Sequence, residues 1–151
     1  MSATGLKVFD DTLGKTNRWL NDIMKLLDWS DRKKAYQALR ATLHTLRDRL
    51  MPDEVPHLGA QLPMLIRGIY YENWDPGCEH LRERSKQEFL SHIADMFEPS
   101  DRDLDFEAIA QAVFQVLNMH VDSGQIDQLR AMLPAEVREL WPVPDQIVAV
   151  H

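Results

Sequence analysis

The amino-acid sequence repeats itself in a degenerate form, and this repeat limits the folds that the chain can adopt. A shift of 71 residues places residues 35–70 on residues 106–141. The identical pairs are Ala41/Ala112, Leu46/Leu117, Leu58/Leu129, Ala60/Ala131, Leu62/Leu133, Pro63/Pro134 and Arg67/Arg138. A proline and an arginine that match at the same place in the pattern are more specific than matched leucines. We interpret the chain as two copies of one helical unit.

The apolar residues of each copy recur at three- and four-residue spacing, which is typical of helices that bury one face. This spacing predicts helices over residues 16–27, 31–50, 52–70, 86–97 and 106–121, and a last helix that follows a turn and cap at residues 122–124 and ends at Trp141. Ser30 and Ser85 are expected to cap the helices that follow them. Pro63 and Pro134 should interrupt the third and last helices, because proline lacks an N–H group and clashes with the preceding turn.

A unit of about 55 residues buries too little surface to be stable alone. Two copies packed face to face, about a pseudo-twofold axis, would solve this problem. The sequence therefore predicts an all-α fold, with residues 1–151 in a single compact helical domain. This domain would consist of two tandem pseudo-repeats of three to four helices each, over residues 15–74 and 85–142.

The two ends of the chain fall outside the predicted pseudo-repeats. Residues 1–14 form an N-terminal arm without a clean period, which we expect to be partly ordered and to lay Leu6, Val8, Phe9 and Leu13 on the body. Residues 143–151 form a C-terminal tail that is apolar enough to pack along the body.

Charge and composition exclude several classes of protein. The net charge of −7 argues against nucleic-acid binding, which usually requires a basic surface. The single cysteine, Cys78, cannot form an internal disulfide and fits a reducing compartment. The chain contains no apolar run of the roughly 20 residues that span a bilayer, and its start lacks the apolar core of a signal peptide. We therefore expect a cytoplasmic protein without membrane or nucleic-acid partners.

Several short motifs point to one protein family. They are residues 39–41 (LRA), 43–44 (LH), 46–50 (LRDRL), 60–63 (AQLP), 66–71 (IRGIYY) and Trp74, with Leu-Pro and Leu-Trp recurring near the C-terminus. On these motifs the chain resembles, from about residue 15 to Pro142, a bacterial family known as domain of unknown function 2267. The resemblance implies a small all-helical bacterial protein. The family has no established activity, so the resemblance implies no catalytic residues.

The repeat separates positions that are alike in both copies, which are structural candidates, from positions that differ. Arg67 and Arg138 are alike, and each could stack on its neighbouring aromatic residue or pair with a carboxylate near the helix joint. The alternative is an anion-binding arginine pair, because the guanidinium group matches phosphate and carboxylate oxygens.

A basic stripe is the clearest difference between the copies. Lys33, Arg40 and Arg47 are spaced by seven residues and line one side of a helix, with His44 beside them. Their counterparts in the second copy are Leu104, Gln111, Asn118 and Gln115. The stripe predicts a site for an acidic partner segment, or for a phosphorylated or carboxylated small molecule. The alternative is a solvated helix face whose arginine stems cover the edge of the core.

Tyr71 and Trp74 also lack apolar counterparts in the second copy. We interpret them as a wedge between the two halves. The alternative is an exposed anchor for a partner, because tyrosine and tryptophan are frequent in interface hot spots.

No motif of a known chemistry occurs in the sequence. There is no Gly-rich phosphate loop, no Gly-x-Ser-x-Gly and no His-Glu-x-x-His, and the six histidines lack ligand spacing. We expect no catalytic residues, no cofactor and no metal. The leading hypothesis is a non-enzymatic helical interaction or scaffold module that uses the basic stripe, with Tyr71 and Trp74 at its rim. A further hypothesis is a homo-oligomer in which exposed apolar residues of the arm or tail pack across a twofold axis. The alternative is a binder of a small anionic ligand, or an enzyme, with a pocket between the halves near Arg67, Arg138 and His44.

Overall fold

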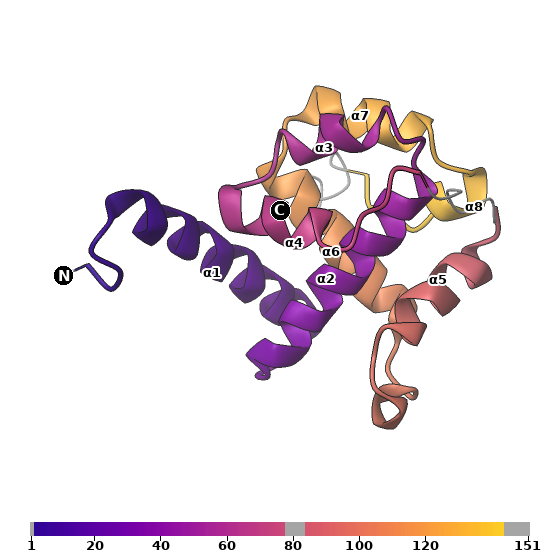
Figure 1. Ribbon diagram of the computed structural model, residues 1–151. Coiled ribbons are helices and arrows are strands. Elements are labelled where there is room, and N and C mark those ends of the chain that lie inside the picture. Colours follow the sequence, from indigo (N-terminus) through magenta and orange to yellow (C-terminus); the bar gives the residue numbers. More distant parts are fainter. Residues whose placement is uncertain (1, 78–83, 144–151) are drawn as a thin grey trace.

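The computed structural model describes residues 2–77 and 84–143, and within these ranges it contains helices and no strand (Figure 1). The elements are α1 (Lys7–Leu27), α2 (Arg32–Arg49), α3 (Val55–Gly59), α4 (Met64–Tyr71), α5 (Lys86–Asp95), the 3₁₀ helix η1 (Pro99–Asp101), α6 (Phe106–His120), α7 (Ser123–Ala131) and α8 (Ala135–Arg138). The predicted all-α fold is confirmed. Cys78 and most of the C-terminal tail lie outside the described residues.

Local sequence signals explain where most of these helices begin. Asp31, rather than the expected Ser30, caps α2, because its carboxylate accepts the amides of residues 33 and 34. Ser85 caps α5 as predicted, and its Oγ accepts the Glu88 amide at 3.1 Å. Pro63 and Pro134 occupy the N-cap positions of α4 and α8. The two prolines therefore break the pattern where the sequence predicted.

The start of the chain differs from the prediction. Helix α1 begins at Lys7, within the expected irregular arm, and runs away from the body as the long helix at the left of Figure 1. The carboxylate of Asp10 accepts hydrogen bonds from the amide and hydroxyl of Thr4, at 3.1 and 2.8 Å, and from the hydroxyl of Ser2. The apolar residues of this region do not lie on the body: Leu6, Val8, Phe9 and Leu13 are all exposed.

The core forms around two helices, α2 and α6, which contact each other at the centre of the molecule (Figure 1). Helix α1 packs on α6 while α5 packs on α2; α4 packs on α1 while α8 packs on α5. A pseudo-twofold axis that exchanges the halves would produce these reciprocal pairs. The tandem repeat itself stays a prediction. Stacked rings of Phe114 and Trp141, with centroids 4.2 Å apart, fill the second half of the core.

A close contact joins α3 to the end of α4. The fully buried Tyr70 donates its hydroxyl to the Val55 carbonyl at 2.8 Å, and burial raises the pKa of this phenol well above its ordinary value. The next ring, Tyr71, lies over Gly59, so that a Cβ atom there would come within 2.4 Å of the Tyr71 oxygen. Gly59 is therefore required by the position of the Tyr71 side chain.

Two glycine substitutions test this packing. Gly68→Ala should raise the free energy of unfolding by roughly 0.5–1 kcal/mol, because a Cβ atom at Gly68 meets nothing within 4 Å and alanine favours the helix. Gly59→Ala should lower the free energy of unfolding, because the Tyr71 ring has to leave its place. Urea unfolding of the two variants measures both effects. Equal stabilisation by both substitutions would contradict the inferred contact.

Candidate functional site

Two residues of the predicted basic stripe are buried and fasten the end of α4 to α2. The side chains of His44 and Arg47 are each 4 % exposed. Arg47 Nη1 donates to the carbonyl oxygens of Tyr70 and Glu72, both at 2.8 Å, and its Nε donates to Asp48 at 2.8 Å. His44 Nε2 donates to the Ile69 carbonyl at 2.6 Å. The last carbonyls of a helix lack partners within it, so these two side chains cap α4 from outside.

In the second half of the chain, the corresponding positions carry polar side chains that are neutral. Asn118, the counterpart of Arg47, donates to the Pro142 carbonyl at 2.8 Å and accepts the indole N–H of Trp141 at 2.7 Å. The side chain of Asn118 also donates to Gln115, the counterpart of His44, at 3.3 Å. Asn118 therefore holds the segment that follows α8 rather than the end of that helix, and it does so with a neutral side chain. Burial removes His44 and Arg47 from the predicted interaction surface.

The other two residues of the stripe lie outside the core. Lys33 is exposed in the first turn of α2. Arg40 is 28 % exposed and pairs with Glu72, with 2.9 Å between Nε and Oε1. Arg40 and Glu72 line a hollow of about 350 Å³ together with Tyr36, Gln37, Ala41 and Met96. Within the described residues Lys33 has no ion-pair partner, so an acidic partner would meet this lysine and one arginine that already has a carboxylate.

Tyr71 and Trp74 are partly buried and pack against the core. The Tyr71 ring contacts Tyr70 edge-on at 5.1 Å and Trp74 at 5.5 Å between centroids. These ring contacts, like the contact with Gly59, lie within the first half of the chain. The side chains complete the α3–α4 corner.

Arg67 and Arg138 make the same contacts 71 residues apart. Arg67 donates from Nε to the Gly59 carbonyl at 3.1 Å and from Nη2 to the Leu62 carbonyl at 3.0 Å. Arg138 donates from the same atoms to the carbonyls of Arg130 and Leu133, at 3.0 and 2.9 Å. Each arginine thus spans the proline joint through backbone oxygens, where the sequence suggested an aromatic residue or a carboxylate.

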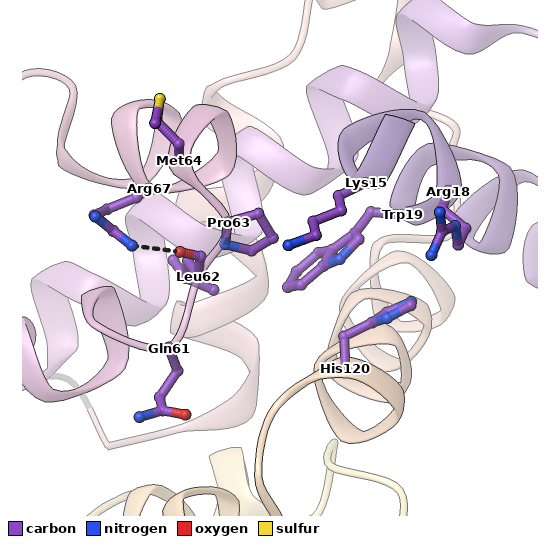
Figure 2. Close-up of a pocket in the computed structure, with 9 residues that line it drawn as sticks. All are labelled: Lys15, Arg18, Trp19, Gln61, Leu62, Pro63, Met64, Arg67 and His120. Carbon is purple, nitrogen blue, oxygen red and sulfur yellow. Dashed lines mark hydrogen bonds between the residues drawn. The ribbon is translucent and has the colours of Figure 1, made fainter. Parts of the chain in front are cut away.

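The two arginines do not form a joint anion site, because they line different hollows. Arg138 borders a hollow of about 740 Å³ with Gln111, Arg130, Ala135, Glu139, Leu140, Trp141, Pro142 and Val143, where the described part of the chain ends. Arg67 borders a hollow of about 430 Å³ with Lys15, Arg18, Trp19, Gln61, Leu62, Pro63, Met64 and His120 (Figure 2). His44 lines neither of them.

The hollow beside Arg67 contains three other basic residues that the sequence analysis did not select, namely Lys15, Arg18 and His120. Lys15 and Arg18 come from α1, and His120 is the last residue of α6. The comparison of the two copies contained the signal, because a shift of 70 residues aligns α1 with α5 and places Ser85 and Glu88 at the positions of Lys15 and Arg18. The arrangement of α1 across the α3–α4 joint was needed to show that these side chains line the same hollow as Arg67.

The described residues carry no group of three or more histidine, cysteine or acidic side chains that could hold a metal ion. Within the same residues, no helix has the length and hydropathy needed to cross a bilayer.

Comparison with known proteins identifies the family. The model of the uncharacterized conserved protein family DUF2267 matches residues 16–140, so the chain belongs to this family. No curated protein matches the chain.

Arg47 should contribute far more to stability than Arg40. Arg47→Met should lower the free energy of unfolding by about 3 kcal/mol or more, because a buried charge–carbonyl network is lost and buried carbonyls are left without donors. Arg40→Met removes an exposed ion pair and should change it by less than about 1 kcal/mol. Urea unfolding measures both values. Similar losses in the two variants would contradict the capping role of Arg47.

His44 should make stability depend on pH. Burial lowers the pKa of His44, and the charges of Arg47 and Arg40 lower it further, against the hydrogen bond to Ile69 and the charge of Asp48. Below the ordinary histidine pKa of about 6.5, the unfolded chain then binds a proton that the folded chain does not. This contribution is complete above pH 6.5 and is lost as the pH falls through the folded pKa.

The comparison that isolates this effect is His44→Gln, which keeps a donor for the Ile69 carbonyl but does not titrate. Between pH 7.5 and 5, the wild type should lose more unfolding free energy than the variant. Parallel pH profiles for the two proteins would show that His44 does not carry the effect.

Proposed function

We propose that this DUF2267 protein is a non-enzymatic helical interaction module, and that it assembles through the uncovered beginning of α1. A stripe at alternating three- and four-residue spacing runs along this helix: Leu6, Phe9, Leu13, Thr16, Leu20 and Ile23. Its second half is covered, since Thr16, Leu20 and Ile23 are at most 9 % exposed. Its first half is not, since Leu6, Phe9 and Leu13 are 51, 46 and 39 % exposed.

This uncovered half of one continuous apolar stripe is the observation that carries the proposal. Residues repeating at this spacing form the seam of a coiled coil, in which each helix covers the other. A second helix with a similar seam is therefore the complementary partner. Met64 and Leu65, which are 50 and 38 % exposed, extend the apolar surface, because the Leu65 amide donates to the Thr12 hydroxyl at 2.9 Å and so lies beside α1.

The partner that we propose is a second copy of this chain. In an antiparallel pair centred between residues 9 and 10, Leu6 of one helix would face Leu13 of the other, and the two Phe9 rings would meet. An isologous contact of this kind needs only the surface that one chain provides. The stripe is short, so the expected dimer is weak, with a dissociation constant on the order of micromolar.

The acidic partner suggested by the basic stripe has less support. His44 and Arg47 are buried, and Arg40 is paired with Glu72, which leaves Lys33 as the available cation of the four. The cellular setting of the proposal is a bacterial cytosol, which rests on the family resemblance and on the single cysteine.

Two neighbouring substitutions test the assembly. Phe9→Glu places a charge in the seam and should weaken self-association at least about tenfold, because a charge is costly to bury. Val8→Glu makes the same change of charge at a side chain that is 51 % exposed but lies about 100° around the helix. It should leave association within about threefold of the wild type. Sedimentation velocity over a range of concentrations gives the association constants.

Both positions are exposed, so neither change should affect the fold, and circular dichroism provides that control. A wild-type protein that stays monomeric up to several hundred micromolar would refute the second copy as partner. Equal weakening by both substitutions would refute the stripe as the contact surface.

A further inference from the structure

The hollow beside Arg67 brings together basic side chains from three parts of the chain. Helix α1 contributes Lys15 and Arg18, the α3–α4 joint contributes Arg67, and the end of α6 contributes His120. Figure 2 shows Lys15 and Trp19 projecting from α1 toward Pro63, with His120 below the Trp19 ring. Among the residues that the structure describes, no acidic side chain lines this hollow, although the protein as a whole carries a net charge of −7.

The basic side chains of the hollow differ in the hydrogen-bond and ion-pair partners that they already have. Within residues 2–77 and 84–143, Lys15 and Arg18 have no hydrogen-bond or ion-pair partner. Arg67 is held in place by the carbonyls of Gly59 and Leu62, so it lends a fixed positive charge. His120 pairs with Asp22, with 2.8 Å between Nε2 and Oδ2. Lys15 and Arg18 are therefore the two groups free to close on an anion.

Besides the basic groups, the lining consists of the amide side chain of Gln61 and four apolar side chains. Leu62, Pro63 and Met64 form one side, and Trp19 stacks on His120 with ring centroids 5.1 Å apart. A volume of about 430 Å³ lies within the range of sites for small organic molecules. Pro63 and Met64 supply the accessible apolar surface, since Trp19 and Leu62 are buried. This apolar strip beside two free cations suits a molecule that has a small apolar body and one charged end.

We propose that this hollow binds a small organic anion whose phosphate or carboxylate group lies between Lys15 and Arg18 and whose apolar body lies along Pro63 and Met64. Arginine and lysine are the side chains that proteins use for such groups, through charge-assisted hydrogen bonds. The site belongs to the first copy of the repeat alone, because Ser85 and Glu88 stand at the corresponding positions of the second copy. The charged part of the site uses residues of α1 other than those of the apolar stripe, and Met64 alone borders both surfaces.

Titration of ¹⁵N-labelled protein with four probes tests the site. Phenyl phosphate and benzoate carry the two anionic groups on an apolar body, inorganic phosphate lacks the body, and phenol lacks the charge. Phenyl phosphate, benzoate or both should cause saturable shifts of the amides of residues 15–19 and 61–67, and should bind at least about tenfold more tightly than inorganic phosphate and phenol. The stronger of the two identifies the preferred group. Raised salt should weaken the binding.

Charge reversal at Lys15 and Arg18 provides the decisive variant, and its matched control reverses Lys25 and Lys33. The double variant Lys15→Glu/Arg18→Glu should weaken phenyl phosphate or benzoate at least about tenfold, since each lost charged hydrogen bond accounts for that factor. Lys25→Glu/Lys33→Glu changes the net charge equally at two exposed lysines outside the hollow and should bind within about threefold of the wild type.

Lys15→Gln/Arg18→Gln provides a milder change if the charge reversal disturbs the fold. Three results would overturn the proposal: neither anion shifts these amides at millimolar concentration, phenol binds as tightly as the anions, or both double charge reversals weaken binding equally. The last result would assign the binding to net charge alone.

Discussion

Helix ends that meet the core must find hydrogen-bond donors, and this requirement shapes the contacts around α2 and α6. Helix α4 ends against α2, where the carbonyls of Tyr70 and Glu72 require donors and the Ile69 carbonyl otherwise accepts only the Glu72 amide, at 3.3 Å. His44 and Arg47 supply the donors from within the buried face of α2. In the second half of the chain, Asn118 of α6 donates a hydrogen bond to the carbonyl of Pro142. The chain thus fastens both halves to the central helices through polar side chains placed among apolar ones.

The proline joints have an equally simple physical basis. Proline starts a new helix in a new direction, which exposes the carbonyls of the preceding turn. An arginine four residues later bends back and donates to two of these carbonyls, once at Arg67 and once at Arg138. Each joint is therefore stabilised by an arginine that lies four residues after the proline. At the first joint the neighbouring helix brings Lys15 and Arg18 beside the arginine, and a basic hollow results.

The proposals both follow from the length of α1. This helix has 21 residues, whereas its counterpart α5 has 10. The additional turns extend beyond the body and leave Leu6, Phe9 and Leu13 without a cover, and the middle of the helix faces the α3–α4 joint. Assembly and ligand binding would use different sides of the same helix. Both proposed features lie in the first of the two predicted copies.

Sequence pattern alone was enough for the all-α class, the proline breaks at Pro63 and Pro134, and most of the core, because helical spacing and proline chemistry are local properties. The basic stripe shows the limit of what the sequence pattern could predict. Lys33, Arg40, His44 and Arg47 share one side of a helix in the sequence, yet two of them are buried and two are not.

Only the tertiary structure distinguishes the buried residues of the stripe from the exposed ones, because it determines which backbone carbonyls lie against α2. The same holds for α1, whose apolar positions look alike along the helix. Whether they are core or surface depends on how far the other helices reach, and that is a property of packing between distant segments.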